Sequence, residues 1–493
     1  MNGQPLARQQ RVVVIGGGLA GITAAIALSE AGAAVTLLEA RPRLGGATTS
    51  FNRGALVVDT GQHVFLRCCT AYRGLLARLG MTGSTQLQDR FDVSVLSPHG
   101  SARLRRNALP APLHMGPALA RYPLLSIPER MRVGRAALAM RALDPADPAL
   151  DGQRLGDWLA RYGQDERTRR VLWDLFTVSS LNIAGDDASL ALAATVIKTA
   201  LLGEKDAADI GVPAVPLGEL HGTAGLALLR RLGAEVRLGA KAAAVELARD
   251  REPGGRYRVT LARDDSDEGP EVPGDPGRSG GVLRADGVVI AVPATAAAKL
   301  VPPAAGAPSS TWPELGTSPI INVHVIYDRR VTRLPFAAAV DSPVQWVFDR
   351  TGISGFGTSN RGQYLAISLS AAEPYVDVPA ARLREIFVPA LAELLPGARD
   401  ARVSEFFVTR ERRATFRQGP GCGRFRPQAA TALPGLALAG AWTDTGWPDT
   451  MEGAVRSGLN AAIELRRGLG GPSGHGGPGA ARPAEGEPQG AAA

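Results

Sequence analysis

The sequence predicts an α/β protein, in which a discontinuous Rossmann-like dinucleotide-binding domain carries an inserted mixed α+β domain. Three observations support this fold class. An apolar run at residues 12–15 leads through a glycine-rich turn into a helix. A second strand-to-helix junction, with a strand at 436–439 and a helix at 452–467, comes near the other end of the chain. Between the two junctions, runs of alternating apolar and polar residues are typical of antiparallel strands.

The first elements form a βαβ unit. The run 12–15 is continuously apolar, as a strand buried on both faces requires. Residues 19–30 are rich in alanine and helical in period, and Gly32 can close that helix in the left-handed conformation. A second apolar strand follows at 35–38.

The middle of the chain holds further elements of both kinds. Dinucleotide-domain candidates are a helix at 226–232, strands near Val236 and Val245, and strand-like runs at 257–261 and 288–292. Candidates for the inserted domain are a basic helical segment at 103–143, an apolar helix at 185–203, and alternating strands at 320–327, 345–348 and 364–369.

This interleaving predicts that both domains are assembled from separated pieces. The dinucleotide-binding domain takes residues 11–88, 205–300 and 405–467, and the substrate domain takes 89–204 and 301–404. We expect disorder or flexibility where large apolar residues are too few to offset the entropy of ordering, at 1–10, 264–281 and 468–493. The segment 264–281 is interpreted as a long hairpin loop between the runs 257–261 and 288–292.

Composition excludes several classes of protein. The net charge of +8 comes mostly from arginine amid abundant alanine, glycine and proline, so we expect no nucleic acid as a partner but some attraction to anionic lipid. No run of about 18 apolar residues predicts a transmembrane helix, and the polar first ten residues do not resemble a secretory signal. The three cysteines, Cys68, Cys69 and Cys422, cannot form a disulfide framework, which favours a cytoplasmic protein.

The glycine-rich turn satisfies the G-x-G-x-x-G pattern with Gly16, Gly18 and Gly21, with Leu19 and Ala20 between the last two. The first glycine allows the tight turn, the second allows amides to approach a diphosphate, and the third allows helix and strand to pack closely. The second strand ends at Glu39, whose carboxylate can accept both hydroxyls of a ribose. The N-terminal segment therefore predicts binding of the adenine half of a dinucleotide.

The residues after Glu39 indicate which dinucleotide, FAD or NAD, is bound. Ala40, Arg41, Arg43 and the pair Gly45-Gly46 continue the site. This stretch resembles the extended signature of the amine oxidase and phytoene desaturase flavoprotein superfamily, and the resemblance implies non-covalent FAD. It implies that Arg43 screens the diphosphate and that the two glycines pass close to the flavin side. Ala47 stands where that superfamily usually has an arginine.

The C-terminal junction resembles the second FAD motif of the same superfamily. It consists of Leu438, Ala439 and Gly440, followed by the segment 451–458 that begins at Met451. The resemblance implies that a strand delivers the chain to the isoalloxazine and that the helix N-terminus stabilises anionic reduced flavin. Ala441 stands where that superfamily often has an acidic residue that binds the ribityl chain, so either Asp444 substitutes for it or that bond is missing.

Three further patches resemble the hydroxysqualene dehydroxylase family of bacterial hopanoid biosynthesis. They span residues 59–65 with the cysteine pair, 345–350 and 442–448. The resemblance covers about residues 11–467 and implies reduction of 12-hydroxysqualene, an apolar C30 isoprenoid, to squalene by reduced FAD. It also places Gly61, Gln62 and His63 along the flavin. No second glycine motif for a nicotinamide cofactor is convincing, so the electron donor stays unidentified.

Such a reaction needs an acid, an apolar channel and exclusion of water. His63 is the first candidate for the acid, with Asp444 and Asp449 as alternatives. A neutral His63 bonded to flavin or backbone is equally consistent with the sequence. Candidate channel residues are Trp346, Phe348, Trp442 and Trp447, although strand aromatics are often core. His324 is interpreted as a satisfied sheet histidine, and no ligand spacing predicts a metal.

Two other functions fit the same sequence pattern. A carotenoid-type desaturase or an amine oxidase would use the flavin oxidatively. A lipid carrier of the same fold, similar to the prenyl-binding GTPase dissociation inhibitors, would bind isoprenoids without flavin chemistry. The arginine-rich segment 103–143 could also lie on the inner face of a membrane as a peripheral contact, and a solvated basic face explains it equally well.

Overall fold

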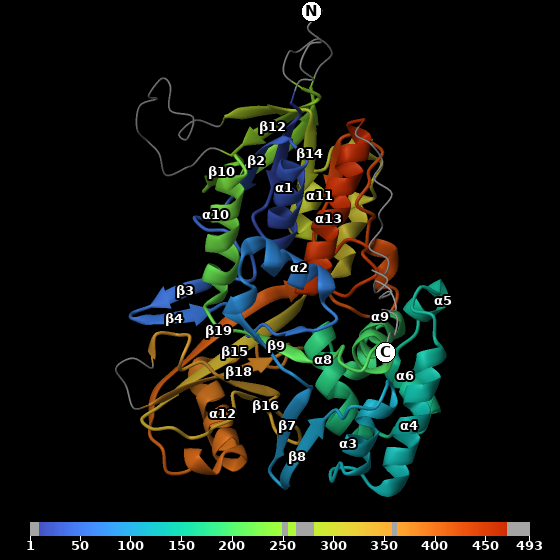
Figure 1. Ribbon diagram of the computed structural model, residues 1–493, viewed down its shortest axis with the longest axis vertical. Helices are drawn as coiled ribbons and strands as arrows, with labels where there is room; N and C mark the ends of the chain where they lie inside the picture. Colours follow the sequence, from blue (N-terminus) through green and yellow to red (C-terminus); the bar gives the residue numbers. More distant parts are fainter. Residues whose placement is uncertain (1–8, 249–254, 263–280, 357–361, 471–493) are drawn as a thin grey trace, which may run out of the picture.

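The computed structural model describes residues 9–248, 255–262, 281–356 and 362–470 (Figure 1). It confirms the predicted fold class: a parallel sheet with helices on one face adjoins a large mixed sheet and a helical layer. The segments expected to be disordered, 1–10, 264–281 and 468–493, fall almost entirely outside the described residues.

The dinucleotide half is built on a five-stranded parallel sheet. Its strands lie in the order β10 (Glu235–Leu238), β2 (Ala34–Glu39), β1 (Arg11–Ile15), β14 (Gly287–Ile290) and β20 (Leu436–Leu438). One face is covered by α1 (Leu19–Glu30), α2 (Thr70–Leu79), α10 (Ala224–Arg231) and α13 (Met451–Gly468). The sheet thus brings together segments from both ends and the middle of the chain.

The other face of this sheet packs on a small antiparallel sheet of β11 (Ala242–Leu247), β12 (Tyr257–Leu261) and β13 (Val282–Ala285). The predicted hairpin between 257–261 and 288–292 is wrong, because β12 pairs with β13 instead. The run at 288–292 supplies β14, whose four residues are all buried, as in the centre of a parallel sheet.

The second half is built on a seven-stranded sheet. Its order is β19 (Val403–Thr415), β15 (Ser318–Tyr327), β18 (Gln363–Leu369), β17 (Trp346–Asp349), β16 (Phe336–Ala339), β7 (Asp92–Ser97) and β8 (Gly100–Arg105). All neighbours pair antiparallel except β16 and β7. The helix α12 (Ala380–Leu394) covers one face, and the opposite face turns toward the dinucleotide half. Residues 405–415 thus join this sheet, and the domain boundaries themselves stay a prediction.

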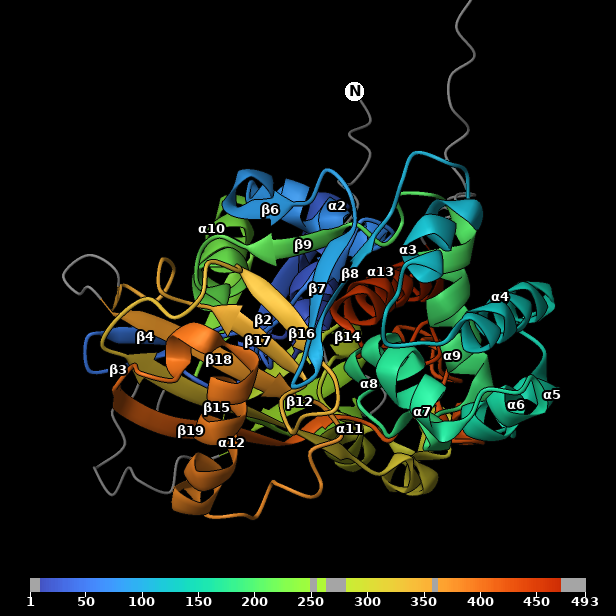
Figure 2. The same ribbon diagram turned by 90° about the horizontal axis from the view of Figure 1, so that it is seen from below.

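A helical layer completes this half (Figure 2). It contains α3 (Gly116–Ala120), α4 (Ile127–Ala142), α5 (Pro148–Asp151), α6 (Leu155–Arg161), α7 (Glu166–Thr168), α8 (Asp174–Leu181) and α9 (Leu190–Ile197). The helical prediction for 103–143 is wrong at its start, because Arg103 to Arg105 end the strand β8. The helix predicted at 185–203 is present over most of its length, because α9 continues as a π-helix over Lys198–Gly203 and a short 3₁₀ turn, Gly185–Asp187, precedes it. Among the described helices, none has both the length and the apolar character to cross a bilayer.

Short strands connect the two halves. The pair β3 (Ser50–Arg53) and β4 (Leu56–Asp59) leads from the dinucleotide turn to the seven-stranded sheet. A three-stranded sheet of β5 (Phe65–Leu66), β9 (Ile210–Pro213) and β6 (Thr85–Leu87) lies beside it. The segment 60–64, between β4 and β5, therefore runs along the boundary between the halves.

Candidate functional site

The turn between β1 and α1 has the close backbone contacts that its glycines allow. Gly16 has a φ of +109°, and a Cβ there would lie 2.4 Å from the Ala291 carbonyl oxygen. A Cβ on Gly21 would lie 1.8 Å from the Gly16 carbonyl oxygen. A Cβ on Gly18 would meet only Gly46, at 3.9 Å, and α1 has no side-chain cap. The helix N-terminus is therefore free to bind an anionic group.

The Glu39 carboxylate lies beside this turn at the end of β2. It accepts hydrogen bonds from the backbone amides of Gly17 at 2.7 Å and Arg41 at 2.8 Å. The residue is only 9% exposed. These two bonds fix the carboxylate next to the glycine turn, where a ribose must lie if a diphosphate is bound at α1.

The Gly45-Gly46 pair crosses directly over the turn. The Gly45 amide donates to the Gly17 carbonyl at 2.8 Å. A Cβ on Gly46 would lie 2.9 Å from the Gly18 Cα. Arg41 and Arg43 are exposed at the rim, as is Ala40, while Leu19 and Ala20 are buried beneath. The two glycine motifs of the N-terminal segment thus form one cradle.

The second junction reaches the same cradle from the C-terminal end. Gly440 has a φ of +133°, and its amide donates to the Ser457 hydroxyl at 2.9 Å. A Cβ on Gly458 would lie 2.3 Å from the Ala20 carbonyl oxygen, so α13 packs tightly on α1. The Thr450 hydroxyl caps α13 at the Gly453 amide. The N-terminus of α13 at Met451 and the N-terminus of α1 therefore belong to one site.

The buried Glu452 joins α13 to α2. Its carboxylate accepts from the backbone amides of Ala71 at 3.1 Å and Tyr72 at 2.7 Å, and from Arg456 Nε at 2.7 Å. Acceptors at a helix N-terminus satisfy amides that lack partners inside the helix. Glu452 therefore positions α2, which follows Cys68 and Cys69 directly.

The residues 59–63 lie between this cradle and the seven-stranded sheet. The Asn322 amide on β15 donates to the Thr60 carbonyl at 3.3 Å. A Cβ on Gly61 would lie 3.0 Å from His63 Cε1. Burial lowers the pKa of His63; contacts with Gly61 and Asp59 oppose this shift, and the Arg350 charge adds to it. His63 is therefore neutral at pH 7.

An ion pair between Asp59 and Arg350 connects two of the three patches noted in the sequence. Both side chains are buried, and Arg350 Nη2 donates to Asp59 Oδ2. Asp59 Oδ1 also accepts from the Ser50 hydroxyl at 2.6 Å and the Leu217 amide at 3.0 Å. Because both charges are compensated by hydrogen bonds, the pair fixes residue 59 against the sheet.

Two buried histidines support this region without being charged. His324 Nδ1 lies 2.8 Å from the Tyr364 hydroxyl, and burial lowers its pKa to about 3. His221 Nε2 lies 2.8 Å from the Tyr72 hydroxyl, its Nδ1 lies 3.2 Å from the Thr48 carbonyl, and burial lowers its pKa to about 4. The sheet-histidine interpretation of His324 is confirmed, whereas the support that His221 gives to the cradle was not foreseen.

Buried Arg426 holds the third patch. Its Nη2 donates to the carbonyls of Ala441 at 3.1 Å, Thr443 at 2.7 Å and Trp447 at 2.7 Å. A guanidinium with several fixed donors can fold a loop around itself. No sequence motif pointed to Arg426, because its partners are carbonyls that any residue carries.

The two aspartates of this loop have different surroundings. Asp444 is exposed and accepts from Gln428 Nε2 at 2.8 Å. Asp449, two residues before α13, accepts from the Phe416 amide at 2.9 Å. Burial raises the pKa of Asp449 to about 6, although the Phe416 bond and the Arg426 charge oppose that shift.

The predicted channel aromatics divide into two groups. Trp346 and Phe348 lie on the β17 face that turns toward the dinucleotide half, with ring centroids 6.3 Å apart. Trp442 is buried against Trp312, and its indole N–H donates to the Val292 carbonyl at 3.0 Å. Trp447 is half-buried under the Arg456 guanidinium. Trp442 therefore supports the loop, while the β17 pair belongs to the sheet face beside residues 59–63.

Several buried polar atoms around residues 60–63 have no hydrogen-bond partner among the described residues. They are Thr49 Oγ1, Gln62 Oε1, His63 Nδ1 and Asn322 Oδ1. Buried polar atoms are normally paired, so their clustering fits a polar ring system bound here. With the cradle of glycines, this set fits FAD, whose adenine end would lie at Glu39 and whose isoalloxazine would lie near Gln62 and Met451. Within the described residues, no cluster of metal ligands is present.

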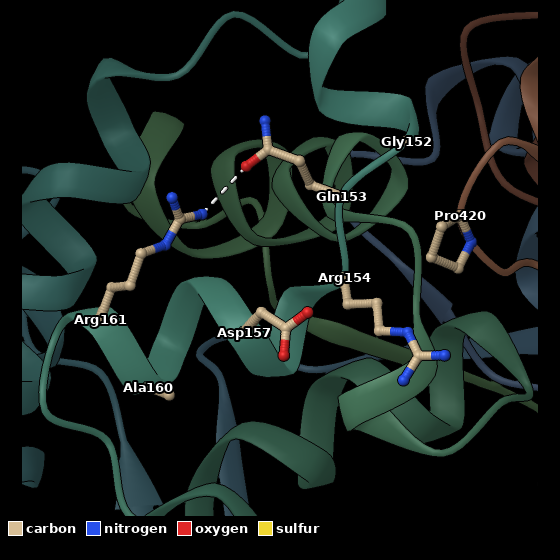
Figure 3. A pocket seen from close by; sticks show the side chains of 7 residues that line it. All are labelled: Gly152, Gln153, Arg154, Asp157, Ala160, Arg161 and Pro420. Carbon is tan, nitrogen blue, oxygen red and sulfur yellow. Dashed lines mark hydrogen bonds between the residues drawn. The ribbon is translucent and has the colours of Figure 1, made fainter.

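A surface hollow of about 600 Å³ lies apart from these residues (Figure 3). It is formed by α6 and the segment 152–154 that precedes it, with Pro420 at its edge, and Arg161 donates to Gln153 Oε1 at 2.9 Å. It shares no residue with the cradle.

Comparisons with known proteins agree with this geometry. Residues 19–465 match the family of flavin-containing amine oxidoreductases. Hydroxysqualene dehydroxylase of Rhodopseudomonas palustris is 28% identical, over 92% of this chain and 97% of that protein. The 15-cis-phytoene desaturase of Narcissus pseudonarcissus is 24% identical, over 92% of this chain and 79% of that protein. Cyclohexylamine oxidase of Brevibacterium oxydans has the same fold, with a TM-score of 0.66 and 18% identity over 94% of this chain and all of that one.

The family match covers most of the chain and includes the α1 and α13 ends of the cradle. A flavin-free lipid carrier is therefore not retained as an alternative. The chain belongs to the flavin-containing amine oxidoreductase family and is an FAD-dependent oxidoreductase.

Proposed function

We propose that this enzyme reduces hydroxysqualene to squalene. The observation that carries the proposal is the likeness to two hydroxysqualene dehydroxylases, 28% and 27% identical over 92% of this chain. In addition, two of the three sequence patches that suggested this family are joined by the Asp59–Arg350 ion pair. The substrate would be an apolar isoprenoid lying between the cradle and the sheet face that carries Trp346 and Phe348.

The net reaction exchanges a hydroxyl for a hydrogen. The allylic alcohol accepts a proton and loses water, and the carbon accepts a hydride, so two electrons must come from a donor that stays unidentified. Bound reduced FAD supplies the hydride chemistry. The chain itself must supply the proton and exclude the water that would recapture an allylic cation.

We assign the proton donor to Asp449 among the three candidates. A carboxyl whose pKa is raised to about 6 by burial keeps a protonated fraction near neutral pH, as a general acid requires. Burial lowers the pKa of His63, which disfavours the imidazolium, so His63 would act as a neutral hydrogen-bonding group beside the flavin. Asp444 is exposed, where water cannot be excluded.

Anaerobic incubation of the photoreduced enzyme with 12-hydroxysqualene tests the proposal. We expect squalene in the lipid extract and return of the flavin absorbance near about 450 nm. A desaturase or an amine oxidase would instead reduce its oxidised flavin with phytoene or an amine. If phytoene or an amine reduces the flavin and no squalene is formed, the proposed substrate is wrong, while the assignments of fold and cofactor are unaffected.

The sheet face gives a second test of the substrate. We expect Trp346→Ala to raise KM about tenfold with little change in kcat, because burial of an aromatic side chain against an apolar ligand contributes roughly 1.5–3 kcal/mol. Val347→Ala is the matched control, since Val347 lies on the opposite face of β17, in the cluster against α12. Equal KM values for the two variants would remove this face from the substrate site.

A further inference from the structure

The end of the molecule formed by β8, α3 and α4 has an unusual surface. Five of the large apolar side chains that are strongly exposed fall within one stretch of thirty residues: Leu109 (46%), Leu113 (60%), Ile127 (70%), Met131 (73%) and Leu138 (62%). Figures 1 and 2 place β8, α3 and α4 side by side at the end opposite the five-stranded sheet. Exposed apolar groups that gather in this way mark interaction surfaces.

The helix α4 carries apolar residues on two opposite faces. Val133, Ala136 and Met140 are buried against the protein. At about 100° per residue, Ile127, Met131 and Leu138 form a second stripe on the far side of the helix. Packing within the chain explains the first face, whereas nothing in the described part of the chain covers the second.

Arginines flank the apolar stripe. Arg130 and Arg141 lie on one side of it and Arg135 lies on the other. None of the three forms an ion pair with another described residue; Arg130 donates only to the Ala120 carbonyl. The one acidic residue of α4, Glu129, is buried and already accepts from the Ser126 amide. The outward face of α4 is therefore apolar in the middle and cationic at its edges.

A basic hollow continues this face. It has a volume of about 800 Å³ and is lined by Arg90, Arg103, Arg105, Arg106 and Arg121 together with Ser94 and Ser101. Asp92 pairs with Arg103 and Arg105, and Asp209 pairs with Arg106. Arg90 and Arg121 form no ion pair within the described residues, so the hollow keeps a net positive charge. Its wall ends at Pro123, just before α4 begins.

We propose that this surface docks on an anionic phospholipid bilayer, with Ile127, Met131 and Leu138 among the acyl chains. The flanking arginines and the basic hollow then lie at the level of the lipid phosphates. An apolar stripe bordered by arginine is the pattern by which helices lie in a membrane interface, and the charge of this end is complementary to anionic headgroups. Leu109 and Leu113, in the loop between β8 and α3, extend the apolar contact. This proposal does not depend on the identity of the substrate.

Co-sedimentation of the full-length FAD-loaded enzyme with phosphatidylcholine vesicles, with and without phosphatidylglycerol, tests the proposal. We expect binding that needs phosphatidylglycerol and weakens at high salt. The triple variant Ile127→Gln, Met131→Gln, Leu138→Gln should lose at least about tenfold in partition, since each buried methylene contributes about fourfold. Arg135→Gln with Arg141→Gln should lose about fivefold for each arginine.

The matched control replaces three exposed apolar residues at the other end of the molecule, Leu238→Gln, Leu247→Gln and Val282→Gln. It should bind vesicles as the parent does, and flavin absorbance verifies that every variant is folded. Absence of binding by the parent at low salt would overturn the proposal, as would equal binding by the two triple variants. A dimer of the parent that the α4 variant abolishes would assign the face to self-association instead.

Discussion

Gly21→Ala is expected to yield protein that is purified without FAD. The added Cβ would lie 1.8 Å from the Gly16 carbonyl oxygen, so either the turn or the helix α1 must move. Overpacking of this kind costs about 1–3 kcal/mol. The displaced backbone is also the part that would bind the diphosphate, so we expect FAD affinity to fall at least about a hundredfold. The ratio of flavin to protein absorbance measures this directly.

Gly74→Ala provides the control for that experiment. Gly74 lies in the interior of α2, is exposed, and a Cβ there would meet no atom within 4 Å. Alanine is favoured over glycine inside a helix by roughly 0.5–1 kcal/mol. This variant should therefore keep its flavin and unfold at a slightly higher temperature. A Gly21→Ala protein with a full complement of FAD would show that the diphosphate is not bound at this turn.

Asp449→Asn is expected to lower kcat by about 10²–10⁴, the usual contribution of a positioned general acid. In the parent enzyme, the acid form of Asp449 is lost as pH rises through about 6. The rate should therefore fall with rising pH, by about tenfold per unit above that value, and this dependence should vanish in the variant. Flavin absorbance should be unchanged.

The same group affects stability with a defined sign. Its pKa in the folded protein is raised from the ordinary 3.8 to about 6, so the folded state binds the proton more tightly than the unfolded chain does. The contribution to stability is present below pH 3.8 and is lost between that value and about 6. Asp449→Asn should remove this pH dependence from the free energy of unfolding.

Two variants separate Asp449 from the other candidates. Asp444→Asn changes an exposed carboxylate of the same loop and should leave the pH profile unaltered. His63→Gln should lower the rate while the fall near pH 6 persists. If that fall instead persists in Asp449→Asn and disappears in His63→Gln, the histidine is the proton donor and our assignment is wrong.

The parts of the fold that the sequence predicted correctly are those set by local pattern. The helix α1 and the strand β12 have the predicted limits, because glycines or polar residues bound each apolar period. The strand β13 was missed, since its four residues follow a long polar insertion and show little alternation. The start of the segment 103–143 was wrongly predicted as helical because β8 is short. In the sequence, the outward-facing arginines of this strand cannot be told apart from those of a basic helix face.

The site shows the same division. Gly16, Gly21 and Glu39 can be recognised from the sequence because they lie within one short segment at the spacing typical of a dinucleotide-binding βαβ unit. The Asp59–Arg350 pair joins residues 291 positions apart, and Arg426 binds carbonyls rather than side chains. Neither the ion pair nor the contacts of Arg426 produce a recognisable sequence pattern. The raised pKa of Asp449 likewise depends on burial by residues from distant segments.

The strands that pair with β1 lie far apart in the sequence, and this affects how the newly synthesised chain can fold. On the ribosome, β1, α1 and β2 are synthesised before their partner strand β14, and β20 and α13 emerge only hundreds of residues after β2. Until β14 pairs with β1, the edge of the β1–β2 pair that β14 covers in the folded protein lacks its partner. Because α13 packs directly on α1, the two helix N-termini of the cradle can come together only after α13 has been synthesised.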